Sequence, residues 1–165
     1  MKLRRAVRVD PLVITEEHAG LDGVGPWFNI PDGSALRLDE LLGTVVLIEF
    51  WTYICANCTR TVPFLRELYE EHPRTDLKIV GVHTPELAVD RRARNVADAV
   101  RTLGIRYPVG MDNDFAAWNR WGVQAWPTLF LVDRAGRLRR QHIGEGGYRE
   151  LRRCVVQLVA EPSAT

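Results

Sequence analysis

Two cysteines with two residues between them, Cys55 and Cys58, are the side chains of this sequence best suited to do chemistry. They follow an apolar run, residues 45–51, and they begin a segment with helical spacing of apolar residues. A thiol at a helix N-terminus lies near unpaired N–H groups and the positive end of the helix dipole, which in general lowers a cysteine pKa to roughly 3.5–7.5. We therefore expect Cys55 to attack a disulfide as a thiolate and Cys58 to resolve the mixed disulfide.

Two other interpretations of the pair are weaker. A zinc site needs two further Cys or His ligands at suitable spacing. The remaining Cys and His residues are scattered: His18, His72, His83, His142 and Cys154. No metal site is therefore predicted. A purely structural disulfide would close so short a loop that it would constrain the unfolded chain little.

One carboxylate, Glu49, lies inside the apolar run that precedes the dithiol. A buried carboxylate is costly unless it is paired, and the loss of hydration raises its pKa. A carboxyl group with a raised pKa can exchange a proton with a nearby thiol. We therefore predict that Glu49 is a proton shuttle for Cys58, the alternative being that it points to an edge or pairs with an arginine.

The pattern of apolar residues predicts the elements that position these side chains. The β-branched run 45–51 is typical of a central strand covered on both faces, and a helix is expected from about residue 55 to 71. Further elements are a strand at 77–82, a helix from Thr84 to Gly104, a short helix at 112–122, a hairpin of strands 128–133 and 138–143, and a last helix to about residue 160. This order predicts an α/β domain of three layers, α/β/α, around a mixed sheet.

The N-terminal part predicts an addition to that domain. Residues 27–30 and 35–38 flank a turn and are expected to form a β-hairpin extension. Residues 1–22 show little periodicity and are expected to be a loose arm, whereas 161–165 are expected to be a polar tail. The domain itself is expected to span residues 23–160.

The composition excludes some classes of function. The 165 residues include 22 Lys plus Arg and 21 Asp plus Glu, for a net charge of +1, which argues against a dedicated binder of nucleic acid. With 46% hydrophobic and 26% charged residues, the chain is typical of a single soluble domain, and a monomer is expected. No signal peptide or membrane span is predicted. The chain as written would be cytoplasmic, or extracytoplasmic if it is cut from a longer membrane-anchored parent.

Motifs along most of the chain resemble the thioredoxin superfamily. They are Phe50-Trp51 before Cys55-Ala56-Asn57-Cys58, then Pro63, and then Trp126-Pro127-Thr128-Leu129 before a strand. The chain is similar to the TlpA-like thioredoxins, and most similar to the soluble thioredoxin-like domain of DipZ-type proteins, which share a Phe-Trp-Thr-Tyr stretch before the cysteines. The matches extend over about residues 24–160.

This resemblance implies roles for the matching residues. Pro127 would be a cis-proline beside the dithiol, and Trp126 would offer its backbone to an extended substrate. Trp51 and Ile54 would add substrate contacts, and Glu49 would be the buried acid beneath the cysteines. The implied partners are protein thiols and disulfides, a membrane electron donor of the CcdA type is compatible with the resemblance, and no cofactor is implied.

The expected activity is thiol–disulfide exchange with protein substrates. A thiol peroxidase is the alternative enzyme, because Thr52 precedes Cys55 by three residues, although Ile48 stands where that family has proline. A redox-inert module that binds a partner beside Pro127 is a further alternative, which the intact cysteine pair disfavours. Cys154 is expected to be a small packing residue of the last helix.

Overall fold

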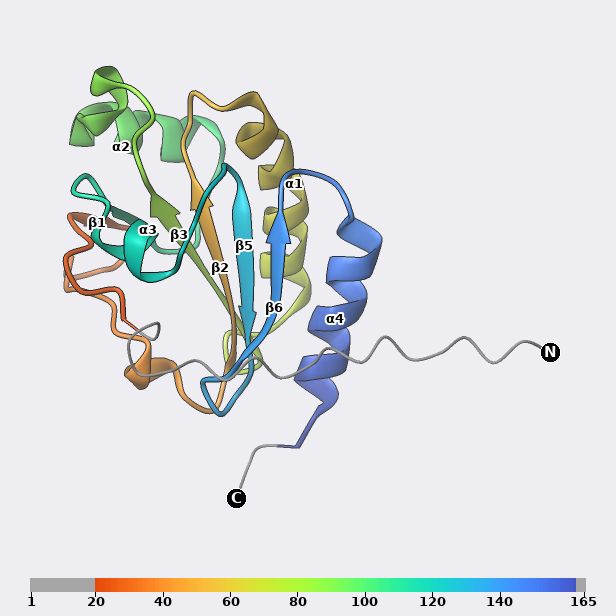
Figure 1. The fold of residues 1–165 in the computed structure, drawn as a ribbon. Coiled ribbons are helices and arrows are strands. Elements are labelled where there is room, and N and C mark those ends of the chain that lie inside the picture. The colour runs from red at the N-terminus through yellow and green to blue at the C-terminus, as the bar shows by residue number, and fades with distance from the viewer. Residues whose placement is uncertain (1–19, 163–165) are drawn as a thin grey trace.

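The computed structural model describes residues 20–162 and contains one six-stranded sheet with helices on both faces (Figure 1). The strands are β1 (Trp27–Phe28), β2 (Val45–Trp51), β3 (Leu77–His83), β4 (Val109–Met111), β5 (Thr128–Val132) and β6 (Leu138–Ile143). The helices are α1 (Ala56–Glu71), α2 (Ala93–Thr102), α3 (Ala116–Arg120) and α4 (Tyr148–Ala160), with short 3-10 helices η2 (Asp39–Leu41) and η3 (Ala88–Arg91). The expected three-layer architecture around a mixed sheet is confirmed.

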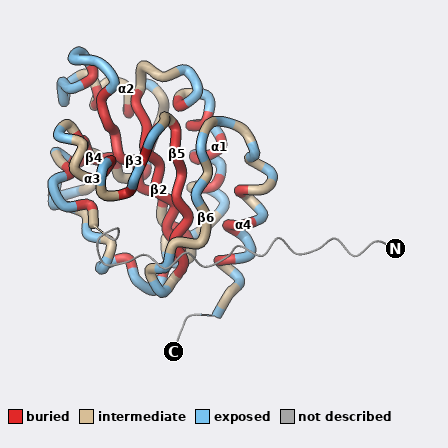
Figure 2. The backbone as a smooth tube through the Cα atoms, viewed as in Figure 1, coloured by how far each residue is buried: buried red, intermediate tan, exposed pale blue. Residues whose placement is uncertain are grey.

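Strand β2 lies at the centre of the sheet because both of its faces are apolar. The strand order is β1-β4-β3-β2-β5-β6, and β2 pairs in parallel with β3 and antiparallel with β5. Every residue of β2 is buried, as the central strands in Figure 2 show. Odd-numbered β2 residues pack toward α1, α2 and α4, and even-numbered ones pack toward α3. Glu49 therefore shares a face with the helix that carries the cysteines.

The expected N-terminal β-hairpin is wrong. Strand β1 pairs antiparallel with β4, and residues 35–38 form no strand. Leu36 and Leu38 instead pack against the core on the α3 side. The three residues of β4 are too few to show a periodicity, and a pairing between segments far apart in the sequence leaves no local turn signal.

The helix expected from Thr84 begins only at Ala93, after η3. The intervening segment is fixed by Asp90, which is fully buried. The Asp90 carboxylate accepts hydrogen bonds from the backbone N–H groups of Glu86 and Leu87, at 2.9 and 3.0 Å. These bonds cap the start of η3 and keep the preceding residues out of an α-helix, which a propensity argument does not anticipate.

Gly110 in β4 lies directly opposite Trp27 in β1. A Cβ atom at this position would lie 2.5 Å from Val24 Cγ1 and 2.9 Å from two atoms of the Trp27 ring. We therefore expect Gly110→Ala to lower the free energy of unfolding by about 1–3 kcal/mol, the usual cost of overpacking a core. Urea unfolding followed by tryptophan fluorescence measures this change. An unchanged midpoint would contradict the close approach of Trp27 to β4.

The N-terminal end of the described chain is packed. Leu21 is buried, and the Gly20 carbonyl accepts a hydrogen bond from Arg120 at 3.1 Å. The expected loose arm is therefore wrong for residues 20–22, because an apolar side chain and a long-range hydrogen bond anchor them. Residues 1–19 of that arm lie outside the described residues.

The C-terminal end is partly anchored as well. Glu161, the first residue of the expected polar tail, forms an ion pair with Arg139 at 2.7 Å. Residues 163–165 of that tail lie outside the described residues. Among the helices of residues 20–162, none is long and apolar enough to cross a membrane.

Candidate active site

The dithiol lies where the chain passes from β2 into α1. Cys55 is the N-cap of α1, and Cys58 lies in the first turn of that helix. Cys55 is partly exposed, whereas Cys58 is fully buried, and both are free thiols. One sulfur is therefore accessible to a partner while the other lies behind it, as attack followed by resolution requires.

The loop before β5 lies against the Cys55 thiol. The Trp126–Pro127 peptide bond is cis, as the resemblance implies. The Trp126 carbonyl lies 3.9 Å from Cys55 Sγ, which donates a long hydrogen bond to it. The Trp126 indole N–H donates to the Thr84 carbonyl at 3.0 Å, and the Trp118 ring centroid lies 4.4 Å from the Trp126 ring centroid. These contacts hold the Trp126 backbone beside the accessible sulfur.

Glu49 is fully buried, as predicted. The Tyr107 hydroxyl donates a hydrogen bond to Glu49 Oε2 at 3.5 Å, whereas Oε1 has no hydrogen-bond partner among the described residues. Burial raises the pKa of Glu49 to about 8, and the Tyr107 hydrogen bond opposes the rise. The group that limits the rise in the pKa of the Glu49 carboxyl is thus a tyrosine and not the arginine of the alternative interpretation.

The pKa of the Cys58 thiol is also raised. Burial is the main cause, and the neighbouring Glu49 carboxylate adds to it, while a backbone hydrogen bond at Thr52 opposes it. A thiol that retains its proton is a poor nucleophile until a base removes that proton. The Glu49 charge raises the pKa of the Cys58 thiol, so the two groups interact. This interaction supports the prediction that the Glu49 carboxylate is the base.

Tyr107→Phe removes the hydroxyl group that donates to Glu49. We expect the pKa of Glu49 to rise above its value of about 8, because the desolvation that raises it is then unopposed. Infrared difference titration of the protonated carboxyl band measures this pKa, with Glu49→Gln as the control that lacks the band. An unchanged or lower pKa would show that the tyrosine hydroxyl does not contact the carboxylate in solution.

Two further residues expected to contact substrate, Ile54 and Trp51, differ in exposure. Ile54 is partly exposed directly before Cys55 and remains a candidate for that contact. Trp51 has no exposed surface, so the expectation that it contacts substrate is wrong. The central strand is covered up to its last residue, and the Trp51 ring lies edge-on to the His83 ring with centroids 5.3 Å apart. Trp51 therefore supports the cysteine loop from within the core.

A buried polar cluster lies beneath the cysteine loop, and the sequence patterns do not predict it. Thr52 Oγ1 donates to the Asp90 carboxylate at 2.6 Å, and both side chains are fully buried. His83 is fully buried and stacks on Tyr53 with ring centroids 5.6 Å apart. Burial lowers the pKa of His83 to about 4, although Asp90 opposes the change, so the imidazole is neutral at neutral pH. The position of His83 at a strand end is a local signal of this cluster, but no local pattern pairs Thr52 with Asp90.

The Gly-rich segment before α4 joins both sides of the site. Glu145 in this segment forms an ion pair with Arg60 of α1 at 2.6 Å, and Arg60 also donates to the Asn57 side chain between the cysteines. The Gly144 N–H donates to the Pro127 carbonyl at 2.8 Å. Because the ion pair is exposed, it contributes little free energy, but it adds to the contacts that connect the cysteine helix with the proline loop.

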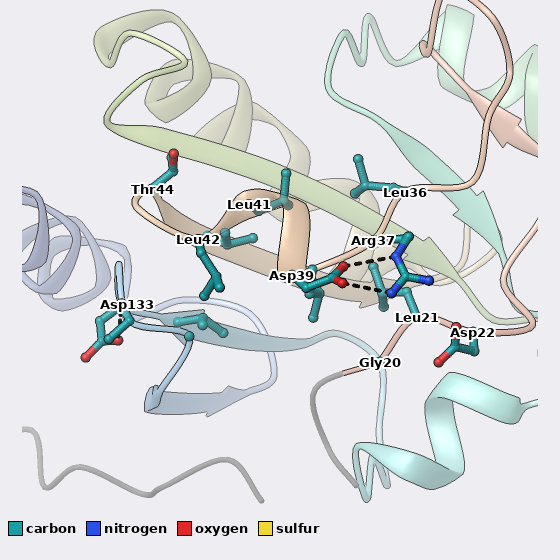
Figure 3. Close-up of a pocket in the computed structure, with 15 residues that line it drawn as sticks. Gly20, Leu21, Asp22, Leu36, Arg37, Asp39, Leu41, Leu42, Thr44 and Asp133 are labelled. Carbon is teal, nitrogen blue, oxygen red and sulfur yellow. Dashed lines mark hydrogen bonds and ion pairs between the residues drawn. The ribbon is translucent and has the colours of Figure 1, made fainter. Parts of the chain in front are cut away.

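Away from the dithiol, the described residues include a large cavity but no cluster of three His, Cys, Asp or Glu side chains that could hold a metal. The cavity of about 770 Å³ is shown in Figure 3. Its apolar lining includes Leu21, Leu36, Leu38, Leu41 and Leu42. Thr44, directly before β2, and Val46, its second residue, also line the cavity, whereas Cys55 follows the end of β2. The cavity therefore lies at the opposite end of the sheet from the site.

Fold and site together define a thioredoxin-like protein with a dithiol at the start of a helix. The family model described as "AhpC/TSA family" matches residues 25–141, and the chain belongs to that family. It is 39% identical over 139 residues to protein DipZ of Mycobacterium bovis, an alignment that covers 84% of this chain and 20% of DipZ. It is 29% identical over 114 residues to the thiol-disulfide oxidoreductase ResA of Bacillus thuringiensis, covering 69% of this chain and 63% of ResA.

Solved structures agree with the fold. A thiol-disulfide isomerase from Corynebacterium glutamicum matches with a TM-score of 0.74 at 21% identity, over 84% of this chain and 94% of that chain. The resemblance to TlpA-like and DipZ-type thioredoxin domains is thereby confirmed. The chain spans about a fifth of the length of DipZ.

Proposed function

We propose that this chain is a thiol–disulfide oxidoreductase that exchanges its Cys55/Cys58 pair with protein thiols and disulfides. One observation carries the proposal: a partly exposed sulfur faces the carbonyl that precedes cis-Pro127, while the second sulfur is buried behind it. The relatives named as thiol-disulfide oxidoreductase and isomerase support the same activity.

The reaction proceeds by two successive exchanges. The Cys55 thiolate attacks one sulfur of a substrate disulfide, the S–S bond breaks, and the other substrate sulfur leaves as a thiolate. Glu49 then takes the proton of Cys58, whose thiolate attacks the Cys55 sulfur and releases the second substrate sulfur. The substrate gains two electrons, and the protein holds a Cys55–Cys58 disulfide until an external dithiol reduces it. The same steps in reverse oxidise a substrate dithiol.

Substrate contact is assigned to the surface around Cys55. The Trp126 carbonyl is close to the reacting sulfur, so an extended substrate segment would lie along the Trp126–Pro127 backbone. Ile54, which is partly exposed and directly precedes Cys55, offers an apolar contact. Main-chain pairing of this kind accepts many sequences, which suits a protein substrate.

The peroxidase alternative is disfavoured by the hydroxyl that suggested it. A peroxidatic Thr-x-x-Cys arrangement needs the threonine hydroxyl at the cysteine sulfur, but Thr52 Oγ1 is buried and donates to Asp90 at 2.6 Å. The redox-inert alternative does not explain why Glu49 lies buried where it raises the pKa of Cys58.

Three finer assignments extend the proposal. They are a membrane electron donor of the CcdA type, a monomeric state, and an extracytoplasmic location if a longer membrane-anchored parent carries the chain. Light scattering tests the monomer, and reduction of the oxidised chain by membrane vesicles that contain a CcdA-type protein tests the donor.

The discriminating experiment offers the reduced protein insulin or hydrogen peroxide in separate assays. We expect catalysed reduction of the insulin disulfides in the presence of dithiothreitol, and little turnover of peroxide. Rapid peroxide turnover with sulfenic acid on Cys55, and no insulin reduction, would overturn the proposal in favour of the peroxidase.

A further inference from the structure

Three of the five large exposed hydrophobic residues of the described chain belong to segments at the dithiol end of the sheet. The large exposed hydrophobic residues of the described chain are Leu42, Leu87, Val89, Ile143 and Val156. Leu87 and Val89 follow the end of β3, which runs parallel to β2 and so ends beside the cysteine loop. Ile143 ends β6 opposite Thr128, next to Pro127. Apolar surface is thus available on both sides of Cys55, where a protein substrate must approach.

The segment that carries Leu87 and Val89 is fastened to the cysteine loop. Asp90 accepts a hydrogen bond from Thr52 Oγ1 at 2.6 Å and one from the Leu87 N–H at 3.0 Å. The Tyr53 hydroxyl donates to the Val89 carbonyl at 3.4 Å. The two exposed side chains therefore keep a fixed position relative to Cys55, and we call Tyr53, Leu87 and Val89 the apolar ledge.

Two exposed arginines follow the ledge along the chain. Arg92 and Arg94 are exposed, and the ion pairs formed within residues 20–162 include neither of them. The guanidinium of their neighbour Arg91 is engaged by the Asn113 carbonyl, to which it donates a hydrogen bond at 2.9 Å. From Leu87 to Arg94 the segment beside the cysteine loop thus passes from apolar to basic, with the exposed Glu86 at its other end. This favours a partner whose acidic residues follow its apolar side chain on the arginine side.

We propose that the apolar ledge and Arg92 and Arg94 select the protein substrate: a segment whose reactive cysteine is adjacent to a large apolar side chain and whose next residues are acidic. The inference rests on the proposed function, because the segment is placed by its disulfide exchange with Cys55. The apolar side chain lies on Leu87 and Val89, and the acidic side chains face the two arginines.

The test uses three synthetic peptide disulfides of equal length, with dithiothreitol as the reductant. One has Leu beside the cysteine and Asp beyond it, the second replaces Leu by Ser, and the third replaces Asp by Lys. We expect wild-type kcat/KM to be about tenfold higher for the Leu/Asp peptide than for either of the others, the size of effect that one apolar contact gives in a specificity pocket. The Asp-to-Lys difference should shrink at high salt.

Two double variants locate the preference. Leu87→Ser/Val89→Ser should abolish the preference for Leu over Ser, and Arg92→Glu/Arg94→Glu should reverse the preference for Asp over Lys. Leu42→Ser/Val156→Ser is the matched control for the first, because Leu42 and Leu87 are both 58% exposed and Val156 and Val89 are 53% and 47% exposed.

A charge-matched control, Arg149→Glu/Arg153→Glu, changes two exposed arginines of α4, and the ion pairs formed within residues 20–162 include neither of them. Both control variants should keep the wild-type preferences. Equal kcat/KM for all three peptides in wild type, or preferences that survive in the ledge and arginine variants, would overturn the docking surface while leaving the oxidoreductase intact. A wild-type protein that reduces insulin but none of the peptides would also overturn the docking surface alone, whereas one that reduces neither insulin nor any peptide would overturn the proposed function and the inference with it.

Discussion

Cys55→Ser is expected to abolish disulfide reduction, with a loss of at least about 10³-fold in kcat/KM. A serine hydroxyl is not ionised at neutral pH and forms no mixed disulfide, and the buried Cys58 thiol cannot replace the accessible sulfur. The measurement is insulin reduction with dithiothreitol, corrected for the uncatalysed rate. Activity within tenfold of wild type would contradict the role assigned to Cys55.

Cys154→Ser is the control for a general effect of losing a thiol. Cys154 is buried on α4, a helix that does not carry the dithiol. Its sulfur lies 3.6 Å from the Arg140 guanidinium. This variant is expected to retain insulin reduction even if its stability falls. Loss of activity in both variants at equal fold content would indicate that the third cysteine takes part in the reaction.

Glu49→Gln is expected to slow the resolving step by about 10²-fold or more, the range typical of general base catalysis. The pKa of Glu49 is raised to about 8, so its ionised fraction increases as the pH rises through that value. Substrate release from a preformed mixed disulfide should therefore accelerate with pH up to about 8 in wild type and lack that inflection in the variant. Rapid-quench measurement of the released thiol tests this. A variant that keeps the inflection would show that another group is the base.

Although Glu49→Gln is expected to slow the reaction, it is expected to increase the stability of the folded protein at pH 8. Burial raises the pKa of Glu49 from 4.5 to about 8, so between these values the folded protein holds a proton that the unfolded chain has lost. Wild-type stability should therefore fall as the pH rises from about 5 to 8, by up to a few kcal/mol, because each pKa unit corresponds to about 1.4 kcal/mol. Glu49→Gln is always neutral, so it should lack this dependence and be the more stable protein at pH 8. Urea unfolding across this pH range measures the difference, and parallel curves for the two proteins would contradict a raised pKa.

The central part of the fold and site was predictable because its signals are local. A short apolar run rich in β-branched residues favours a covered strand, and the helix with Cys55 at its start follows directly. The burial of Glu49 follows from its place in that run, and the cis bond at Pro127 follows only from the resemblance to a known family, since composition and periodicity do not distinguish peptide isomers.

The remainder of the site depends on contacts between distant segments. Tyr107 precedes β4 and reaches Glu49 only because β4 and β2 flank β3 in the sheet. Asp90 reaches Thr52 only because its segment folds back over the strand ends. The resemblance alone implies a substrate contact for Trp51, but Trp51 pairs with His83 of β3 and its side chain packs in the buried cluster that contains Cys58. Local propensity contains none of these constraints.

The most direct test of the account is to trap the mixed disulfide. Cys58→Ser removes the resolving thiol, so the reduced variant should react with a protein disulfide and stop with the substrate bound to Cys55. Mass spectrometry of the non-reduced digest is expected to show the substrate peptide joined to the peptide that contains Cys55, and its release by dithiothreitol. Substrate joined only to Cys154, or no covalent adduct under conditions in which wild type reduces the same disulfide, would contradict the assignment of Cys55 as the attacking sulfur.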